Sequence, residues 1–171
     1  GISLYRPGPM DSIPTYIENK TNPQNVTYLH EKLKPIMEVT YGCLVYQEQV
    51  MQVVRELGGY TYGRSDLVRR AMGKKKMDVM EEERRYFVYG KEDENGNIEI
   101  AGCIRNGVPE DIANQIFDDM IDFAKYAFNK SHAAAYGVLS YQTAYLKAYY
   151  PVEFMAALIT SVMGNTDKVV E

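Results

Sequence analysis

The sequence contains little cysteine and little histidine. Its 171 residues include two cysteines, Cys43 and Cys103, and two histidines, and it has no C-x-x-C pair. A structural zinc site needs four ligands of these types at characteristic spacings, so this composition argues against one. Two cysteines are also too few for a disulfide scaffold, which predicts a protein of the reducing cytoplasm.

Long apolar runs are missing as well. No stretch approaches the roughly 18 apolar residues that a membrane helix needs. The N-terminus has neither the charged start nor the apolar core of a signal peptide. We therefore expect no membrane among the partners. The abrupt start at Gly1 and the end at Glu171, inside a helix expected to begin near Thr166, predict a piece of a longer chain.

The common catalytic and cofactor motifs are absent too. The sequence has no Walker loop, no Rossmann glycine fingerprint, no G-x-S-x-G elbow and no D-x-D pair of the kind that holds two metal ions. We therefore expect no catalytic residue, no metal ligand and no cofactor within these residues. A net charge of -4 further excludes a uniformly basic DNA binder.

What is present is ordinary globular composition, with 46% hydrophobic and 25% charged residues, enough to build a core. The pattern predicts a mainly α fold: an irregular helical domain with one small β-hairpin near residues 87–104, where Asn95-Gly96 is a strong turn signal. Apolar periodicity, caps and helix breakers place the helices at residues 11–19, 47–57, 66–72, 77–89, from 110 onward, 131–149 and 152–163. Ser65 is the expected N-cap of the helix at residues 66–72.

The charge is unevenly distributed. Residues 64–76 carry six basic side chains and one acidic one, whereas residues 77–99 carry three basic and eight acidic ones. Arginine can hold phosphate oxygens with two parallel hydrogen bonds and lysine adds a point charge, so the basic stretch is a candidate phosphate site. The alternative interpretation is a solvated basic face that answers the acidic run Glu81–Glu83.

The segment F-N-K-S-H-A-A-A-Y, residues 128–136, is a second candidate anion site. Ser131 is the expected cap of the following helix, a helix N-terminus favours anions, and Lys130 adds positive charge. The alternative is that His132 and Tyr136 are core or capping residues and that the alanines pack against another helix.

Five segments of the sequence together resemble the bacterial replicative DNA polymerase III alpha subunits, the C-family polymerases. They occur in that family's order and at roughly its spacing across nearly the whole chain. They are L-Y-R-P-G-P-M (residues 4–10), Y-Q-E-Q-V-M (46–51), R-R-A-M-G-K-K-K (69–76), F-N-K-S-H-A-A-A-Y (128–136) and S-Y-Q-T-A-Y-L-K (140–147).

The resemblance implies that residues 1–171 form the fingers domain, which receives the incoming deoxynucleoside triphosphate. It implies that Arg69 and Arg70 hold the triphosphate, with help from Lys74 and Lys130. It also implies partners outside this chain: primer-template DNA, the palm and other domains of the polymerase, and replisome subunits. Palm aspartates would hold two Mg²⁺ ions, so the fragment alone should be inactive. Contacts to DNA or the nascent base pair are implied for Lys75, Lys76, Asn129, His132 and Tyr136.

The sequence departs from the family pattern at one place. Residues 88–107 form a charged hairpin where the family has a shorter connection, so we expect a hairpin insertion within residues 87–107, as a surface elaboration. Two other functions stay open from the residues alone. One is a non-enzymatic helical module that docks an acidic protein or a nucleic-acid backbone through the basic stretch, and the other is a hydrolase built on Ser131 and His132.

Overall fold

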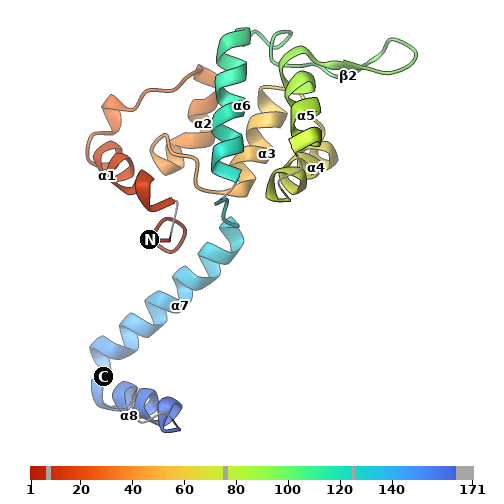
Figure 1. The fold of residues 1–171 in the computed structure, drawn as a ribbon. Helices are drawn as coiled ribbons and strands as arrows, with labels where there is room; N and C mark the ends of the chain where they lie inside the picture. The colour runs from red at the N-terminus through yellow and green to blue at the C-terminus, as the bar shows by residue number, and fades with distance from the viewer. Residues whose placement is uncertain (7–8, 75–76, 125, 165–171) are drawn as a thin grey trace. The chain divides into compact units, whose positions relative to one another are not determined.

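The computed structural model describes residues 1–6, 9–74, 77–124 and 126–164, and the helix expected near Thr166 lies outside them. The described residues contain eight α-helices and one two-stranded sheet, which confirms the predicted mainly α fold (Figure 1). The helices are α1 (Ile13–Thr21), α2 (Lys34–Met37), α3 (Gln47–Glu56), α4 (Tyr62–Gly73), α5 (Met77–Tyr89), α6 (Glu110–Ala124), α7 (Lys130–Tyr149) and α8 (Pro151–Val162). The chain divides into two units, Gly1–Lys130 and Ser131–Glu171.

The first unit is built around the packing of α3, α4, α5 and α6. Each of these helices places apolar side chains in a common core. α5 has the predicted bounds, and α6 begins at Glu110, where the sequence predicts a helix start. The largest of the fully buried side chains include Leu57, Met80, Phe87, Phe117 and Met120. Phe87 and Phe117 join α5 to α6 through a tilted ring contact of 5.5 Å between centroids.

The hairpin expected near residues 87–104 is confirmed, with short strands. β1 (Lys91–Glu92) pairs antiparallel with β2 (Ile98–Ile100), and the loop between them extends away from the helices (Figure 1). At its base, Gly90 and Gly102 both adopt positive φ, and a Cβ on Gly102 would lie 2.3 Å from the Gly90 backbone nitrogen. Only glycine fits this close backbone approach. The chain leaving β2 is tied to α5 by the Cys103 N–H, which donates to the Phe87 carbonyl at 2.7 Å.

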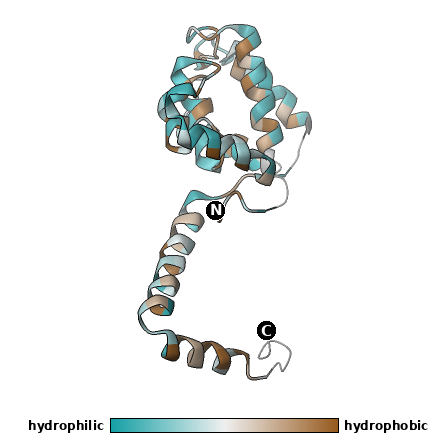
Figure 2. Cartoon of the chain, turned by 90° about the vertical axis from the view of Figure 1, so that its left-hand side faces the viewer, coloured by the Kyte–Doolittle hydropathy of each residue, from teal (hydrophilic) through white to brown (hydrophobic). Residues whose placement is uncertain are grey.

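The second unit is different, because neither of its helices has a buried residue within the described part of the chain. Apolar side chains are concentrated on α8, which carries the brown colour of hydrophobic residues in Figure 2. Val152, for example, is 76% exposed. α7 instead carries a ladder of tyrosines four residues apart, in which the Tyr145 and Tyr149 ring centroids are 4.6 Å apart.

Candidate functional site

The helix that carries the basic stretch begins earlier than the sequence predicts. α4 starts at Tyr62, and the Thr61 hydroxyl accepts the Arg64 backbone N–H at 3.2 Å, the hydrogen bond of an N-cap. The prediction that Ser65 caps this helix is therefore wrong. Ser65 lies within the first turn, fully buried, and its hydroxyl donates back to the Tyr62 carbonyl at 2.7 Å.

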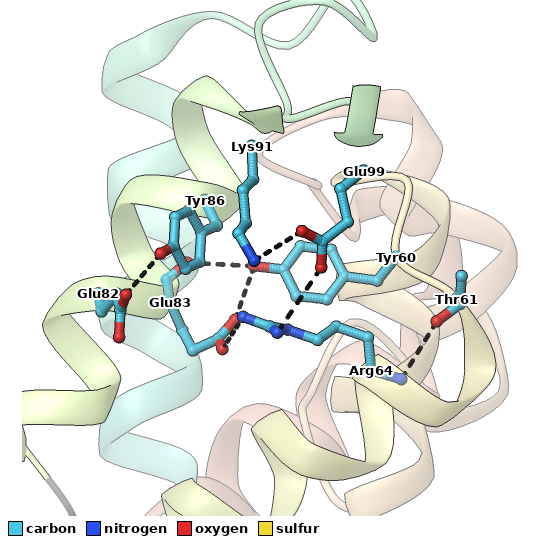
Figure 3. Close-up of polar contacts among 8 residues, drawn as sticks. All are labelled: Tyr60, Thr61, Arg64, Glu82, Glu83, Tyr86, Lys91 and Glu99. Atoms are coloured by element: carbon cyan, nitrogen blue, oxygen red, sulfur yellow. Dashed lines mark hydrogen bonds and ion pairs between the residues drawn. The ribbon is translucent and has the colours of Figure 1, made fainter. Parts of the chain in front are cut away.

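At the start of α4, Arg64 belongs to a buried polar network (Figure 3). Its Nη2 lies 2.6 Å from Oε1 of Glu83, and the Tyr60 hydroxyl donates to Oε2 of the same carboxylate at 3.0 Å. Burial, with the neighbouring Glu83 charge, raises the pKa of the Tyr60 hydroxyl well above its ordinary value, so Tyr60 stays a donor. The network thus satisfies the Glu83 carboxylate from two sides.

The same network reaches the base of the hairpin. Glu99 of β2 lies 3.9 Å from Arg64 Nη1 through one oxygen and 2.6 Å from Lys91 Nζ through the other (Figure 3). The Tyr86 ring lies about equally close to both cations, 5.5 Å from Arg64 and 5.3 Å from Lys91. Arg64 therefore holds α4, α5 and the hairpin together. For this one residue the pairing of the basic stretch with the acidic run is confirmed, although the Glu83 side chain is buried and the Arg64 side chain is only partly exposed.

Near the end of α4, two other arginines share one carboxylate. Asp66 Oδ1 lies 2.8 Å from Arg69 Nε and 2.7 Å from its Nη2, and Asp66 Oδ2 lies 2.7 Å from Arg70 Nη2. Hydrogen bonding from Arg69 and the charges of both arginines lower the pKa of the Asp66 carboxyl below its usual value. The Asp66 carboxylate therefore lies between the two guanidinium groups, in the position that a bound anionic ligand would take.

Arg69 has a second partner, on another helix. Its Nη1 donates to Oε1 of Gln47, the first residue of α3, at 3.2 Å. The Gln47 backbone N–H donates in turn to the Phe128 carbonyl at 2.9 Å, beside an isolated parallel bridge between Tyr46 and Phe128. Gln47 thus joins the two candidate sites that the sequence analysis treats separately.

Lys130, the first residue of α7, lies close to Tyr46 and Glu48 of the first unit. Its Nζ is 5.8 Å from the centroid of the Tyr46 ring. Its backbone N–H donates to both oxygens of Glu48, at 3.1 and 3.2 Å. The prediction that Ser131 caps this helix is wrong, because the helix begins at Lys130 and Ser131 lies within its first turn. An acidic side chain of the chain itself, Glu48, already complements this helix start.

The remaining predicted residues have the following places. Lys74 is exposed directly after α4, with its backbone N–H bonded to the Arg70 carbonyl at 3.1 Å. Asn129 is exposed beside Phe128, and Lys75 and Lys76 lie outside the described residues. His132 and Tyr136 are exposed on α7 in the second unit, with ring centroids 4.6 Å apart. They are surface residues there, not core residues.

Sequence reasoning assigned no role to several residues of this site. Arg6 lies over the Phe128 ring at 5.0 Å, Gln47 contacts Arg69, Glu48 binds the start of α7, and Asp66 joins the arginines. Asp66 had a usable signal, because residues three and four apart are neighbours on a helix. For the other three, the only signal is membership in the R-P-G-P and Y-Q-E-Q segments.

A cavity of about 450 Å³ lies elsewhere in the first unit. Asp11, Asp119 and Asp122 are among its lining residues. Burial and the neighbouring Asp118 and Asp122 raise the pKa of the Asp119 carboxyl. Because carboxylates repel phosphate, this cavity is unsuited to a polyphosphate ligand.

Two features are absent from the ranges of the chain that the structure describes. There, no group of three or more His, Cys, Asp or Glu side chains is arranged to hold a metal ion. No described helix combines the length and the apolar character that crossing a bilayer requires.

Comparison with known proteins gives a consistent result. Residues 1–95 match the model of the bacterial DNA polymerase III alpha subunit finger domain. The chain is 51% identical to DNA polymerase III subunit alpha of Thermus aquaticus, over 99% of the chain and 13% of that protein. It is 47% identical to the Escherichia coli (strain K12) subunit and 45% identical to that of Bacillus subtilis (strain 168), over 99% and 98% of the chain. It spans 14% of each of these two relatives.

Proposed function

The chain belongs to the family of bacterial DNA polymerase III alpha subunit finger domains, and we propose that it holds the triphosphate of the incoming deoxynucleotide during DNA synthesis. The reaction assigned to the whole polymerase is nucleotidyl transfer, in which the primer 3′ oxygen attacks the α-phosphate and pyrophosphate leaves. Such a transfer depends mainly on positioning and on neutralising phosphate charge. Arg69 and Arg70 are the residues to which we give this task.

One observation carries the proposal: a single carboxylate, Asp66, already binds both arginines at 2.7 Å. Phosphate oxygens resemble carboxylate oxygens as acceptors for guanidinium N–H groups. The Arg70 side chain is 62% exposed and the Arg69 side chain 31%, so a triphosphate can reach both. In this arrangement the triphosphate replaces Asp66 on Arg70, while Arg69 keeps its orientation.

The other roles in the proposal follow the resemblance. Lys74 and Lys130 assist the arginines with positive charge, and Asn129, His132 and Tyr136, with Lys75 and Lys76, contact DNA or the nascent base pair. We place the whole of residues 1–171 in the fingers domain, with the hairpin of residues 87–107 as a surface elaboration, in a cytoplasmic polymerase.

We expect the metal ions of the reaction to be held outside this chain. The described residues do not fit a metal site. Following the resemblance, we assign the two Mg²⁺ ions to palm aspartates of the polymerase and expect the chain alone to be inactive. The palm, the other polymerase domains and replisome subunits complete the proposed partners.

The test is substitution of the two arginines in the intact polymerase. Arg69→Ala or Arg70→Ala should each raise the KM for deoxynucleotide about 10- to 100-fold, because a hydrogen bond to a charged group contributes about 1.5–3 kcal/mol. Steady-state primer extension measures KM and kcat. Arg105→Ala is the matched control, since Arg105 pairs with Glu92 at the hairpin surface, and it should leave both unchanged. Unchanged KM and kcat in both α4 variants would refute the assignment.

A further inference from the structure

Gln47 contacts both parts of the site with different atoms. Its side-chain oxygen accepts the Arg69 Nη1–H at 3.2 Å, and its backbone N–H donates to the Phe128 carbonyl at 2.9 Å. The next residue, Glu48, binds the backbone N–H of Lys130. The first two residues of α3 therefore hold an arginine of α4 and the start of α7 in one arrangement.

We propose that Gln47 is a positioning residue for nucleotide binding, which orients the Arg69 guanidinium and sets its place relative to Lys130. This inference rests on the proposed role of Arg69 in holding the triphosphate. It adds a residue from the Y-Q-E-Q segment, which the proposed function does not use.

The chemistry of the amide suits this task. Asp66 holds the Nε and Nη2 side of Arg69 and cancels charge, whereas the neutral Gln47 oxygen holds Nη1 without cancelling any. The two contacts thus fix the orientation of the guanidinium, and the contact with Gln47 does not reduce its attraction for phosphate. Each Nη carries two N–H groups, so one on each stays available to a phosphate oxygen.

Fixing the guanidinium in advance reduces the conformational entropy lost when nucleotide binds. This reduction is larger for Arg69 than for Arg70, because Arg70 contacts Asp66 through one nitrogen, is largely exposed and is therefore less fixed before nucleotide binds. Loss of the Gln47 amide should therefore weaken nucleotide binding through Arg69 alone.

A double-mutant cycle in the intact polymerase tests this coupling. Gln47→Ala removes the side-chain acceptor and keeps the backbone bond to Phe128. It should raise the KM for deoxynucleotide about three- to tenfold, the net worth of one hydrogen bond, with kcat within about twofold. In an Arg69→Ala background, the same substitution should have no further effect on KM. Gln52→Ala, an exposed glutamine of the same helix, is the control and should leave KM unchanged.

The possible results separate the two proposals. If Arg69→Ala raises KM but Gln47→Ala does not, or if their effects simply multiply, Gln47 is not a positioning residue and the triphosphate role of Arg69 stands. If neither Arg69→Ala nor Arg70→Ala changes KM, the proposed function itself fails. Should Gln47→Ala prevent folding, Gln47→Met keeps the length of the side chain without its acceptor and is measured in the same cycle.

Discussion

The two ends of α4 carry the same residue type in opposite surroundings. The Arg64 side chain is 24% exposed and binds the buried Glu83, whereas the Arg70 side chain is 62% exposed and contacts one partly exposed aspartate. An arginine that pairs with a buried carboxylate must stay paired, since separating the two leaves charges uncompensated where little water reaches them. An exposed arginine can exchange one anion for another at little cost. Position along the helix, rather than charge, therefore separates the arginine of the fold from those available to a ligand.

The largest expected effect comes from breaking the pair at the buried end. Glu83→Ala should lower the free energy of unfolding by about 3 kcal/mol, the lower end of the range for breaking a buried pair, because Arg64 keeps some contact with water and with Glu99. Urea denaturation of the chain, followed by circular dichroism, measures the change. Glu81→Ala is the control, since Glu81 is exposed and lies 3.7 Å from Arg84.

The control should lower stability by less than about 0.5 kcal/mol, as surface substitutions commonly do. Equal effects of the two substitutions would contradict the comparison, because the Glu83 carboxylate would then be no more important to the fold than a surface charge.

This contrast also marks where sequence reasoning succeeds. The apolar periods of α3 and α6 and the Asn95-Gly96 turn are local signals, and each predicts an element that the structure contains. Such signals work because the spacing of apolar residues along a few turns already determines which face is buried.

The same reasoning fails where partners are distant in sequence. Arg69 belongs to the basic stretch, yet it binds Gln47, which lies 22 residues away and outside the acidic run. Only the packing of α3 and α4 brings these groups together, and no local pattern encodes it. The predicted Ser65 cap is also wrong. Tyr62-Gly63 has the composition of a turn but continues as helix, so Thr61 is the N-cap residue.

A smaller effect is expected where the buried network meets the surface. Lys91→Ala removes the 2.6 Å ion pair with Glu99 at the hairpin base, where both side chains are partly exposed. Stability should fall by about 0.2–1 kcal/mol, the range for exposed pairs, and the loss should shrink at high salt. Urea denaturation at two salt concentrations measures it. A loss of stability as large as that of Glu83→Ala would mean that the ion pair at the hairpin base contributes as a buried pair does, not as an exposed one.

The smallest expected effect concerns the exposed end and is a change in titration rather than in stability. Asp66 has a lowered pKa, so its interaction with the arginines is present above the unfolded-state value of about 3.9 and is lost as the pH falls through the lower folded value. The Arg69 hydrogen bond is the largest cause of the shift. Arg69→Ala should therefore raise the pKa of Asp66 toward its ordinary value by more than Arg70→Ala does.

Carboxyl chemical shifts followed by NMR during an acid titration measure this order, and Asp93 is an internal control. Its pKa is also lowered, but by hydrogen bonds from Asn97 and Asn95 in the hairpin loop, so neither arginine substitution should move it. If Arg70→Ala raised the pKa of Asp66 more than Arg69→Ala, the carboxylate would belong mainly to Arg70. A triphosphate would then displace the carboxylate more easily from Arg69 than from Arg70, and the division of labour between a fixed Arg69 and an exchanging Arg70 would be reversed.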